Sequence, residues 1–329
     1  MPKESKSLRR QKTKEHPSSW SAPNNSVGKR FRIAGHESFP CRYTWLPKVV
    51  RGLERDRQLF KDEDSAMVEL GLGKNMVRSA RFWAQAARLV GSGGSDITKM
   101  GKALLGDRKG LDQFLEDIRT LWLIHWNLST NTQNPLLAWD LLLNRWQEPE
   151  LAPSKVIKML QREASLQGER ISESTVAQHF ETFLHTYLPT RGKKSEVTED
   201  NLDCPLVELE LLMKIGESTN SEGERESIFA FRRESKPEIT PELFLYCLCD
   251  FWQNRHSEGR TLSFRELAHG HGSPGQIFKL PEDDIRTRLE FLEDQTEGVL
   301  TFAESAHSQQ VQKKREMDST SLLAGIYRT

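Results

Sequence analysis

The segment of residues 62–105, in which glycines separate the predicted elements, constrains the fold of this 329-residue chain more than any other part of the sequence. Gly71 and Gly73 must end a short helix that begins after Asp62, because glycine ends helices and tolerates positive φ. Asn75 is a good N-cap for a second helix. In that helix apolar residues recur at steps of four and three, which predicts one buried face. They are Met76, Ala80, Trp83, Ala87 and Val90.

A polar stripe follows the same helix, two residues out of phase with the apolar one. It consists of Lys74, Arg78, Arg81, Gln85 and Arg88. Two residues are roughly 200° around a helix, so the stripe is predicted to lie opposite the buried face. Charged stripes are usually solvated faces. Here every charge is positive, whereas a merely soluble helix mixes signs to gain ion pairs, so we favour a nucleic-acid contact.

The residues after this helix complete a DNA-binding motif. "GSGG" predicts a tight turn, "DITK" a short strand and "MGKALL" a further helix. Together these elements predict a winged helix-turn-helix over residues 31–110, which offers residues 74–90 to a groove of double-stranded DNA. The predicted DNA contacts are Lys48, Lys74, Asn75, Arg78, Arg81, Lys99 and Lys102.

The net charge of zero hides an uneven distribution of charge. Residues 1–110 contain 23 Lys and Arg against 11 Asp and Glu, whereas residues 111–329 contain 24 against 36. We expect the basic front to meet a polyanion and the acidic remainder to face solvent or basic protein surfaces. The alternative is that the two halves attract each other.

The chain as a whole is predicted to be mainly α and to have four parts. Residues 1–30 are basic and poor in apolar groups, which predicts a disordered tail. After the winged helix, residues 111–195 form a helical middle domain, and residues 196–329 form a C-terminal helical, winged-helix-like domain. The acidic surface of that last domain would repel DNA, so we expect it to hold the fold or a protein partner.

Two side chains of the middle domain illustrate its predicted core. An apolar stripe over residues 111–129 includes Phe114 and His125. We interpret His125 as a hydrogen-bonded core histidine, because no second ligand follows one turn away on the same face.

The sequence also excludes several classes of protein. No apolar run approaches the roughly 20 residues that cross a bilayer, and the basic N-terminus lacks the apolar segment of a signal peptide. We therefore expect a cytoplasmic location and no membrane partner. The four cysteines have no zinc-finger spacing and are interpreted as reduced, mostly buried thiols. They are Cys41, Cys204, Cys247 and Cys249.

The stretch "RIAGHESFPCRYTWLPK", residues 32–48, carries the best candidate for catalysis. Cleavage of a phosphodiester needs a base or metal-bound hydroxide and cations that stabilise the charge on the phosphate oxygens. His36 is the predicted base and Glu37 the predicted ligand of a Mg²⁺ or Mn²⁺ ion, while Arg42 and Lys48 supply the positive charge. The alternative is structural: Glu37 pairs with Arg42 while the neighbouring aromatic residues anchor the first helix.

Four longer motifs resemble a known family. They are "GHESFPCRYTWLPK", "LGLGKNMVRSARFW", "TLWLIHW" and "GSPGQIFKL". They are similar to the SspB-like family of domains of unknown function, found in single-stranded DNA phosphorothioation systems that serve phage defence. The resemblance implies a role in replacing a non-bridging phosphate oxygen by sulfur, alongside a cysteine desulfurase, an ATPase and a sulfur-inserting enzyme.

These observations leave three functions open. The first is a DNA nicking endonuclease that uses Mg²⁺ or Mn²⁺. The second is a non-enzymatic adaptor that binds DNA and recruits the sulfur-transfer and ATPase proteins of the cassette. The third is a transcriptional regulator of the cassette. For assembly we consider a homodimer beside the monomer.

Overall fold

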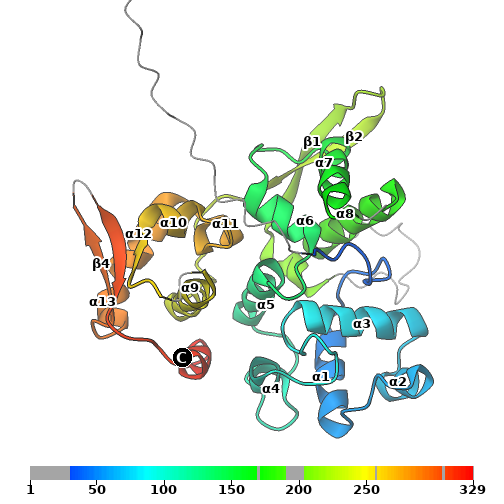
Figure 1. Cartoon of the computed structure of the whole chain (residues 1–329), viewed down its shortest axis with the longest axis horizontal. Coiled ribbons are helices and arrows are strands. Elements are labelled where there is room, and N and C mark those ends of the chain that lie inside the picture. The colour runs from blue at the N-terminus through cyan, green and yellow to red at the C-terminus, as the bar shows by residue number, and fades with distance from the viewer. Residues whose placement is uncertain (1–29, 169–170, 190–203, 256–257, 306–307, 329) are drawn as a thin grey trace, which may run out of the picture. The chain divides into compact units, whose positions relative to one another are not determined.

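Helices make up most of the ordered elements (Figure 1). The computed structural model describes residues 30–168, 171–189, 204–255, 258–305 and 308–328. Residues 31–329 form one compact unit, so the predicted boundaries after residues 110 and 195 fall inside it. Apart from Arg30, the predicted basic tail lies outside the described residues. Among those that are described, no helix is long and apolar enough to cross a membrane.

The first part of the unit holds four helices close to the predicted positions. They are α1 (Trp45–Arg55), α2 (Glu63–Leu70), α3 (Lys74–Ala86) and α4 (Lys99–Leu105). Asp62 caps α2 by accepting a hydrogen bond from the Ser65 backbone, and Gly71 ends it in the left-handed conformation with φ 60°. Both features confirm the predicted helix ends. The N-cap of α3 is Gly73 instead of the predicted Asn75.

The third helix is shorter than predicted, and the wing is smaller. α3 ends at Ala86, because the chain turns at Arg88 with φ 58°. The predicted hairpin is reduced to one antiparallel bridge between Val90 and Ile97. The winged-helix assignment therefore stays a prediction.

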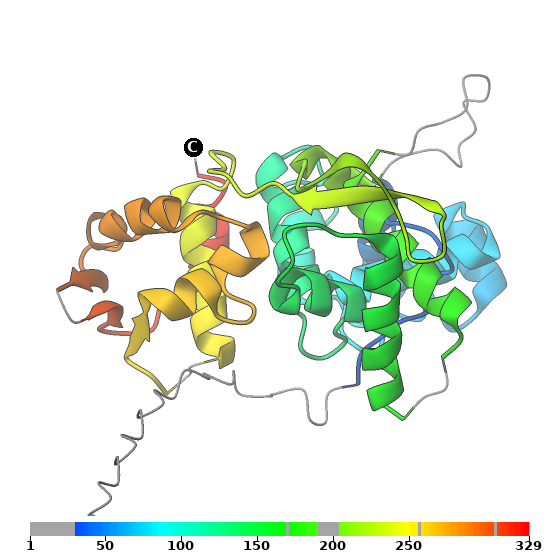
Figure 2. The same cartoon turned by 90° about the horizontal axis from the view of Figure 1, so that it is seen from above.

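The middle part, as far as the structure describes it, contains four helices, as expected of a helical region. It also contains a β-hairpin, which was not predicted from the sequence. The helices are α5 (Ile118–Thr130), α6 (Leu137–Asp140) with a π-helical turn (Leu141–Arg145), α7 (Pro153–Leu166) and α8 (Glu173–Tyr187). A 3₁₀ turn (Pro205–Leu209) leads into the antiparallel strands β1 (Leu212–Thr219) and β2 (Arg225–Phe231). This hairpin lies beside α7 (Figures 1 and 2).

The start of α5 corrects one prediction. The Asp117 side chain caps the helix at residue 118, and Leu115 just before it has φ 60°. The predicted helix over residues 111–129 therefore loses its first seven residues. Phe114, which was predicted on the buried face, is 59% exposed.

The C-terminal part consists of helices and a small sheet. The helices are α9 (Pro241–Arg255), α10 (Phe264–His269), α11 (Pro274–Phe278), α12 (Glu282–Glu290), α13 (Leu292–Gln295) and α14 (Ser319–Gly325). The antiparallel sheet has the order β3 (Thr261–Ser263), β5 (Gln309–Lys313), β4 (Leu300–Glu304). Ser263 and Glu266 form a capping box at the start of α10.

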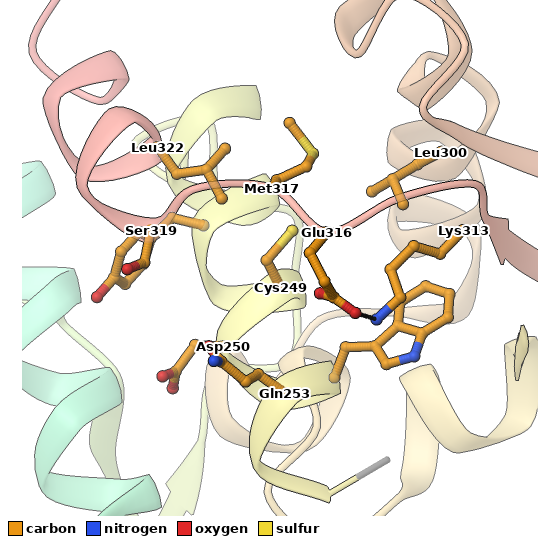
Figure 3. A pocket seen from close by; sticks show the side chains of 11 residues that line it. Cys249, Asp250, Gln253, Leu300, Lys313, Glu316, Met317, Ser319 and Leu322 are labelled. Atoms are coloured by element: carbon orange, nitrogen blue, oxygen red, sulfur yellow. Dashed lines mark hydrogen bonds and ion pairs between the residues drawn. The ribbon is translucent and has the colours of Figure 1, made fainter. Parts of the chain in front are cut away.

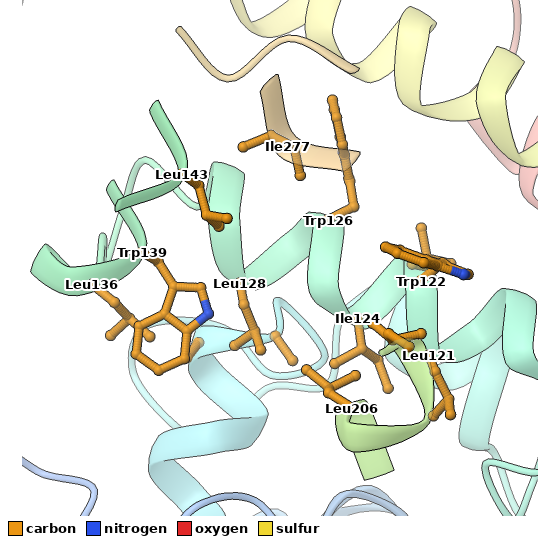
Figure 4. Packing of buried hydrophobic residues seen from close by; sticks show 14 of the residues in the cluster. Leu121, Trp122, Ile124, Trp126, Leu128, Leu136, Trp139, Leu143, Leu206 and Ile277 are labelled. Atoms are coloured by element: carbon orange, nitrogen blue, oxygen red, sulfur yellow. The ribbon is translucent and has the colours of Figure 1, made fainter. Parts of the chain in front are cut away.

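One hydrophobic core joins the three parts. Ten consecutive residues of α5, 120–129, are buried, so this helix packs on all sides. The Trp126 ring lies 5.4 Å from the Phe278 ring of α11, and Trp139 of α6 lies 5.8 Å from Trp83 of α3. Figure 4 shows part of this packing around Trp122, Trp126 and Trp139. The buried residues of the three parts therefore form one continuous cluster.

Candidate nucleic-acid interface

His36, the predicted general base, lies in the core. It is 3% exposed, and its Nε2 atom lies 3.2 Å from Nδ1 of His179 on α8. The Ala138 backbone N–H donates to Nε2 of His179 at 3.1 Å. A neutral His179 therefore carries its proton on Nδ1 and donates it to His36. The other ring nitrogen of His36, Nδ1, then carries the proton and donates it to the Thr182 hydroxyl at 3.3 Å, which itself donates to the Gln178 backbone oxygen.

Burial also keeps both imidazoles neutral. Desolvation lowers the pKa of His36 to about 4 and the pKa of His179 to about 3. With both ring nitrogens of His36 engaged, no lone pair faces solvent to accept a substrate proton. We interpret His36 as a structural residue that joins the opening stretch to α8, in place of its predicted role as a base.

Glu37 and Arg42 do not join His36 in a common site. Glu37 is exposed in a turn where residues 37 and 38 have φ values of 50° and 66°, and its charge acts on Arg78 of α3. Arg42 is 8% exposed, and its guanidinium lies 5.5 Å from the Phe39 ring and 5.4 Å from the Trp45 ring. Arg42 therefore belongs to the packing around the start of the first helix, and no Glu37–Arg42 ion pair of the kind that the structural alternative predicted is seen among the described contacts.

The predicted metal site does not fit the donors that are present. Among the predicted catalytic residues His36, Glu37 and Arg42, only Glu37 has a carboxylate. Within the described ranges, no group of three or more His, Cys, Asp and Glu side chains is placed to hold a metal ion.

The positive stripe of α3 is largely engaged inside the protein. Glu63 of α2 forms ion pairs with Lys74 at 2.9 Å and with Arg78 at 2.5 Å. Arg81 donates to the Gly93 backbone at 2.9 Å, and its guanidinium lies 5.1 Å from the Phe60 ring. The stripe is therefore not a free cationic ridge, because neighbouring elements supply partners that the helical spacing could not reveal.

The last cation of the stripe reaches the C-terminal part. Arg88 pairs with Asp250 of α9 at 3.2 Å and donates to the Thr130 hydroxyl at 2.6 Å. At this point the alternative prediction, attraction between the basic front and the acidic remainder, is confirmed by an ion pair.

Another set of cations stays exposed and forms no ion pair with any described residue. It consists of Arg57, Lys61, Lys99, Lys102, Arg108 and Lys109. We call these six residues the free cation set. They lie on the turn after α1, on α4 and on the turn that follows α4. Lys99 and Lys102 were predicted as DNA contacts, whereas the other four were missed.

Local sequence signals could have identified part of this set. Arg108 and Lys109 stand between Gly106 and Gly110 in the run "GDRKG", which marks a charged surface turn. Lys102 and Arg57 line the same cleft of about 270 Å³, although they are 45 positions apart. Two carboxylates, Glu54 and Asp96, also line this cleft, so the positive charge there is partly balanced.

Two further cavities lie beside α9. One of about 370 Å³ is lined mainly by uncharged polar side chains, with Arg88 and Lys99 as its cations. The other measures about 30 Å³, roughly the volume of one water molecule, and holds the Lys313–Glu316 ion pair beside Cys249 (Figure 3). The second cavity is therefore too small for a nucleotide.

The cysteines behave as the sequence predicted. Cys41, Cys204 and Cys247 are buried, and Cys249 is half-buried. Burial raises the pKa of Cys247 well above its usual value and that of Cys249 to about 12. Neither thiol is an activated nucleophile near neutral pH.

Comparison with known proteins places this geometry in a family. The model of the family described as "Protein of unknown function (DUF4007)" matches residues 33–327. The crystal structure of magnesium ion-bound SspB is similar, with 25% identity and a TM-score of 0.74 over 89% of this chain and 86% of that one. A second SspB crystal structure gives 23% identity and a TM-score of 0.73 over 92% and 88%. No curated protein matches the chain. The chain therefore belongs to the DUF4007 family and is an SspB-like member of it.

Proposed function

We propose that this chain is the DNA-binding component of a DNA phosphorothioation system. The observation that carries the proposal is the free cation set on α4 and on the turns after α1 and α4. Cations bind DNA by neutralising phosphates and releasing counterions. A cation that is not paired with a carboxylate can do so without first breaking an ion pair. The likeness to SspB supports the assignment to such a system.

The beginning of α3 offers two further exposed cations. Lys74 and Arg78 have side chains 58% and 47% exposed, and both share the single carboxylate of Glu63. Exposed ion pairs contribute about 0–1 kcal/mol, so a phosphate can replace Glu63 at small cost. In this proposal the acidic C-terminal part recruits the sulfur-transfer and ATPase proteins.

Reversing two charges of the free cation set tests DNA binding. The variant Arg108→Glu/Lys109→Glu is expected to bind duplex DNA roughly 10- to 100-fold more weakly, because two phosphate contacts become repulsive. The slope of log K against log salt becomes shallower by about 2, near 0.9 for each lost phosphate. Fluorescence anisotropy over a salt series measures both quantities.

The control places the same change on α7. Lys158→Glu/Arg162→Glu alters two exposed cations of that helix and is expected to bind DNA like the wild type. Equal binding by the two variants, or binding that is insensitive to salt, would contradict the proposal.

A second candidate function is strand nicking with Mg²⁺ or Mn²⁺. The similarity to a magnesium ion-bound structure of SspB favours it. The test incubates the purified protein with supercoiled plasmid and each metal and measures open circles. Glu37→Gln removes the one carboxylate of the predicted site and is expected to leave nicking unchanged, because the donors around Glu37 do not fit a metal ion. Loss of nicking in this variant would restore the predicted site at Glu37. A wild-type protein that binds DNA but does not nick it would favour the non-enzymatic adaptor.

A further inference from the structure

Phe114 is held outward by a structured turn between α4 and α5. The buried carboxylate of Asp112 accepts hydrogen bonds from the backbones of Glu116 and Asp117 at 2.9 and 3.1 Å. Leu115, which follows Phe114 in the chain, is 1% exposed and anchors the turn in the core. The turn therefore holds the side chain of Phe114, which is 59% exposed, toward solvent. Leaving this apolar surface in water is unfavourable, and the packing of the turn alone does not explain it.

The ring forms one wall of a cleft over α1. The cleft measures about 310 Å³, and Tyr43 adds a second aromatic ring to its lining. The guanidinium of Arg51 lies 4.8 Å from the centre of the Phe114 ring and donates to the Gln113 backbone at 2.9 Å. The guanidinium thus lies over one face of the Phe114 ring as a cation–π contact.

The charge of the lining favours an anionic occupant. Lys48, Arg51 and Arg55 of α1 all face the cleft, and Glu69 is the one carboxylate among its lining residues. Glu69 pairs with Arg55 at 2.8 Å, and Asp107, outside the lining, lies 3.9 Å from Arg51. Lys48 donates to the backbone oxygen of Leu70 at 2.9 Å and forms no ion pair with any residue that the structure describes. The lining therefore keeps a net positive charge.

We propose that this cleft binds an unpaired nucleotide of a DNA strand, with the base stacked on Phe114 and the flanking phosphates near Lys48 and Arg51. The inference rests on the proposed DNA binding and names its substrate as single-stranded DNA. Aromatic side chains beside cations are the usual platform for single strands, because every base has a π-face. A base inside a duplex is already stacked on both sides and cannot use such a platform. The net positive charge argues against an apolar segment of a protein partner as the occupant.

The test compares single-stranded and duplex DNA of one sequence on the full-length protein by fluorescence anisotropy. Phe114→Ala is expected to weaken single-strand binding about 5- to 100-fold, the range that base stacking contributes, and to leave duplex binding unchanged. Phe114→Tyr keeps a flat ring and is expected to retain the affinity. Phe114→Leu keeps apolar area without a flat ring and is expected to behave like the alanine variant.

Phe291→Ala is the matched control, because Phe291 is 61% exposed on the C-terminal part. A Phe114→Ala protein that binds single strands as tightly as this control overturns the cleft while duplex binding stands. Wild-type protein that binds neither form of DNA overturns the proposed function instead. If Phe114→Ala keeps its single-strand affinity but loses a cassette protein in a pull-down, the cleft is a protein-docking site and the inference is wrong.

Discussion

Lowering the pH from 7 to 5 is expected to destabilise this protein by about 6 kcal/mol, because three buried histidines must stay neutral in the folded state. They are His36, His125 and His179, with exposed fractions of 3%, 0% and 0%. Burial lowers their pKa values to about 4, 4 and 3. Total stabilities of domains are about 5–15 kcal/mol, so a loss of this size approaches unfolding.

The sign of this pH effect follows from which state of the protein, folded or unfolded, binds more protons. An unfolded histidine has a pKa near 6.5, so below that pH the unfolded chain takes up protons that the folded chain cannot. The stability is therefore complete above about pH 6.5 and is lost as the pH falls toward 4. At pH 5 each histidine contributes about 2 kcal/mol to the loss, at 1.36 kcal/mol per unit. Carboxylates whose pKa is lowered, such as Asp117, act below about pH 4 and do not overlap this window.

Urea unfolding followed by tryptophan fluorescence at pH 7.5, 6.5, 5.5 and 5.0 measures the effect, and the chain has eight tryptophans. His185→Gln is the control, because this side chain is 45% exposed on the same helix as His179, and it is expected to leave the pH profile unchanged. An unfolding free energy that is flat between pH 7 and 5 would show that the imidazoles are not buried as described.

The same histidines show what local sequence reveals. His125 was correctly predicted as a core residue, because its apolar helical face is visible in the sequence; its partners, the Tyr187 hydroxyl and the Ile277 backbone, lie at 2.8 and 3.0 Å. His36 was predicted as a base from its neighbours in the chain. Its main partner, His179, is 143 positions away, so no local pattern could place His36 in the core.

Helix ends were predictable for a related reason. The Asp62 cap, the Gly71 terminator and the Ser263–Glu266 capping box act within a few residues, so the sequence contains the whole interaction. The hairpin β1–β2 depends on pairing across a turn and on contact with α7, and it was missed. Of the predicted stripe, residues 74–85 lie on α3 and Arg88 lies just after its end. The partner carboxylates come from α2 and α9, which the helical spacing could not reveal.

The ion pair between Arg88 and Asp250 carries the second large prediction. Replacing Asp250 by Ala is expected to cost about 3–5 kcal/mol, the range for breaking one side of a partly buried pair. The carboxylate accepts from Arg88 and also from the indole of Trp126, at 2.8 Å, and the two charged side chains are only 23% and 19% exposed. Its removal leaves a cation and an indole N–H without their acceptor.

A double-mutant cycle separates the interaction energy of the Arg88–Asp250 ion pair from the other consequences of removing Asp250. Because Arg88→Ala removes the orphaned cation, the double variant Asp250→Ala/Arg88→Ala is expected to be more stable than the sum of the single changes predicts, by about 0.5–3 kcal/mol. Asp283→Ala is the control, since this exposed carboxylate of α12 forms no ion pair with any residue that the structure describes, and it is expected to change stability by less than about 0.5 kcal/mol. If Asp250→Ala unfolds at the same urea concentration as Asp283→Ala, the basic front and the acidic remainder are not joined through this pair.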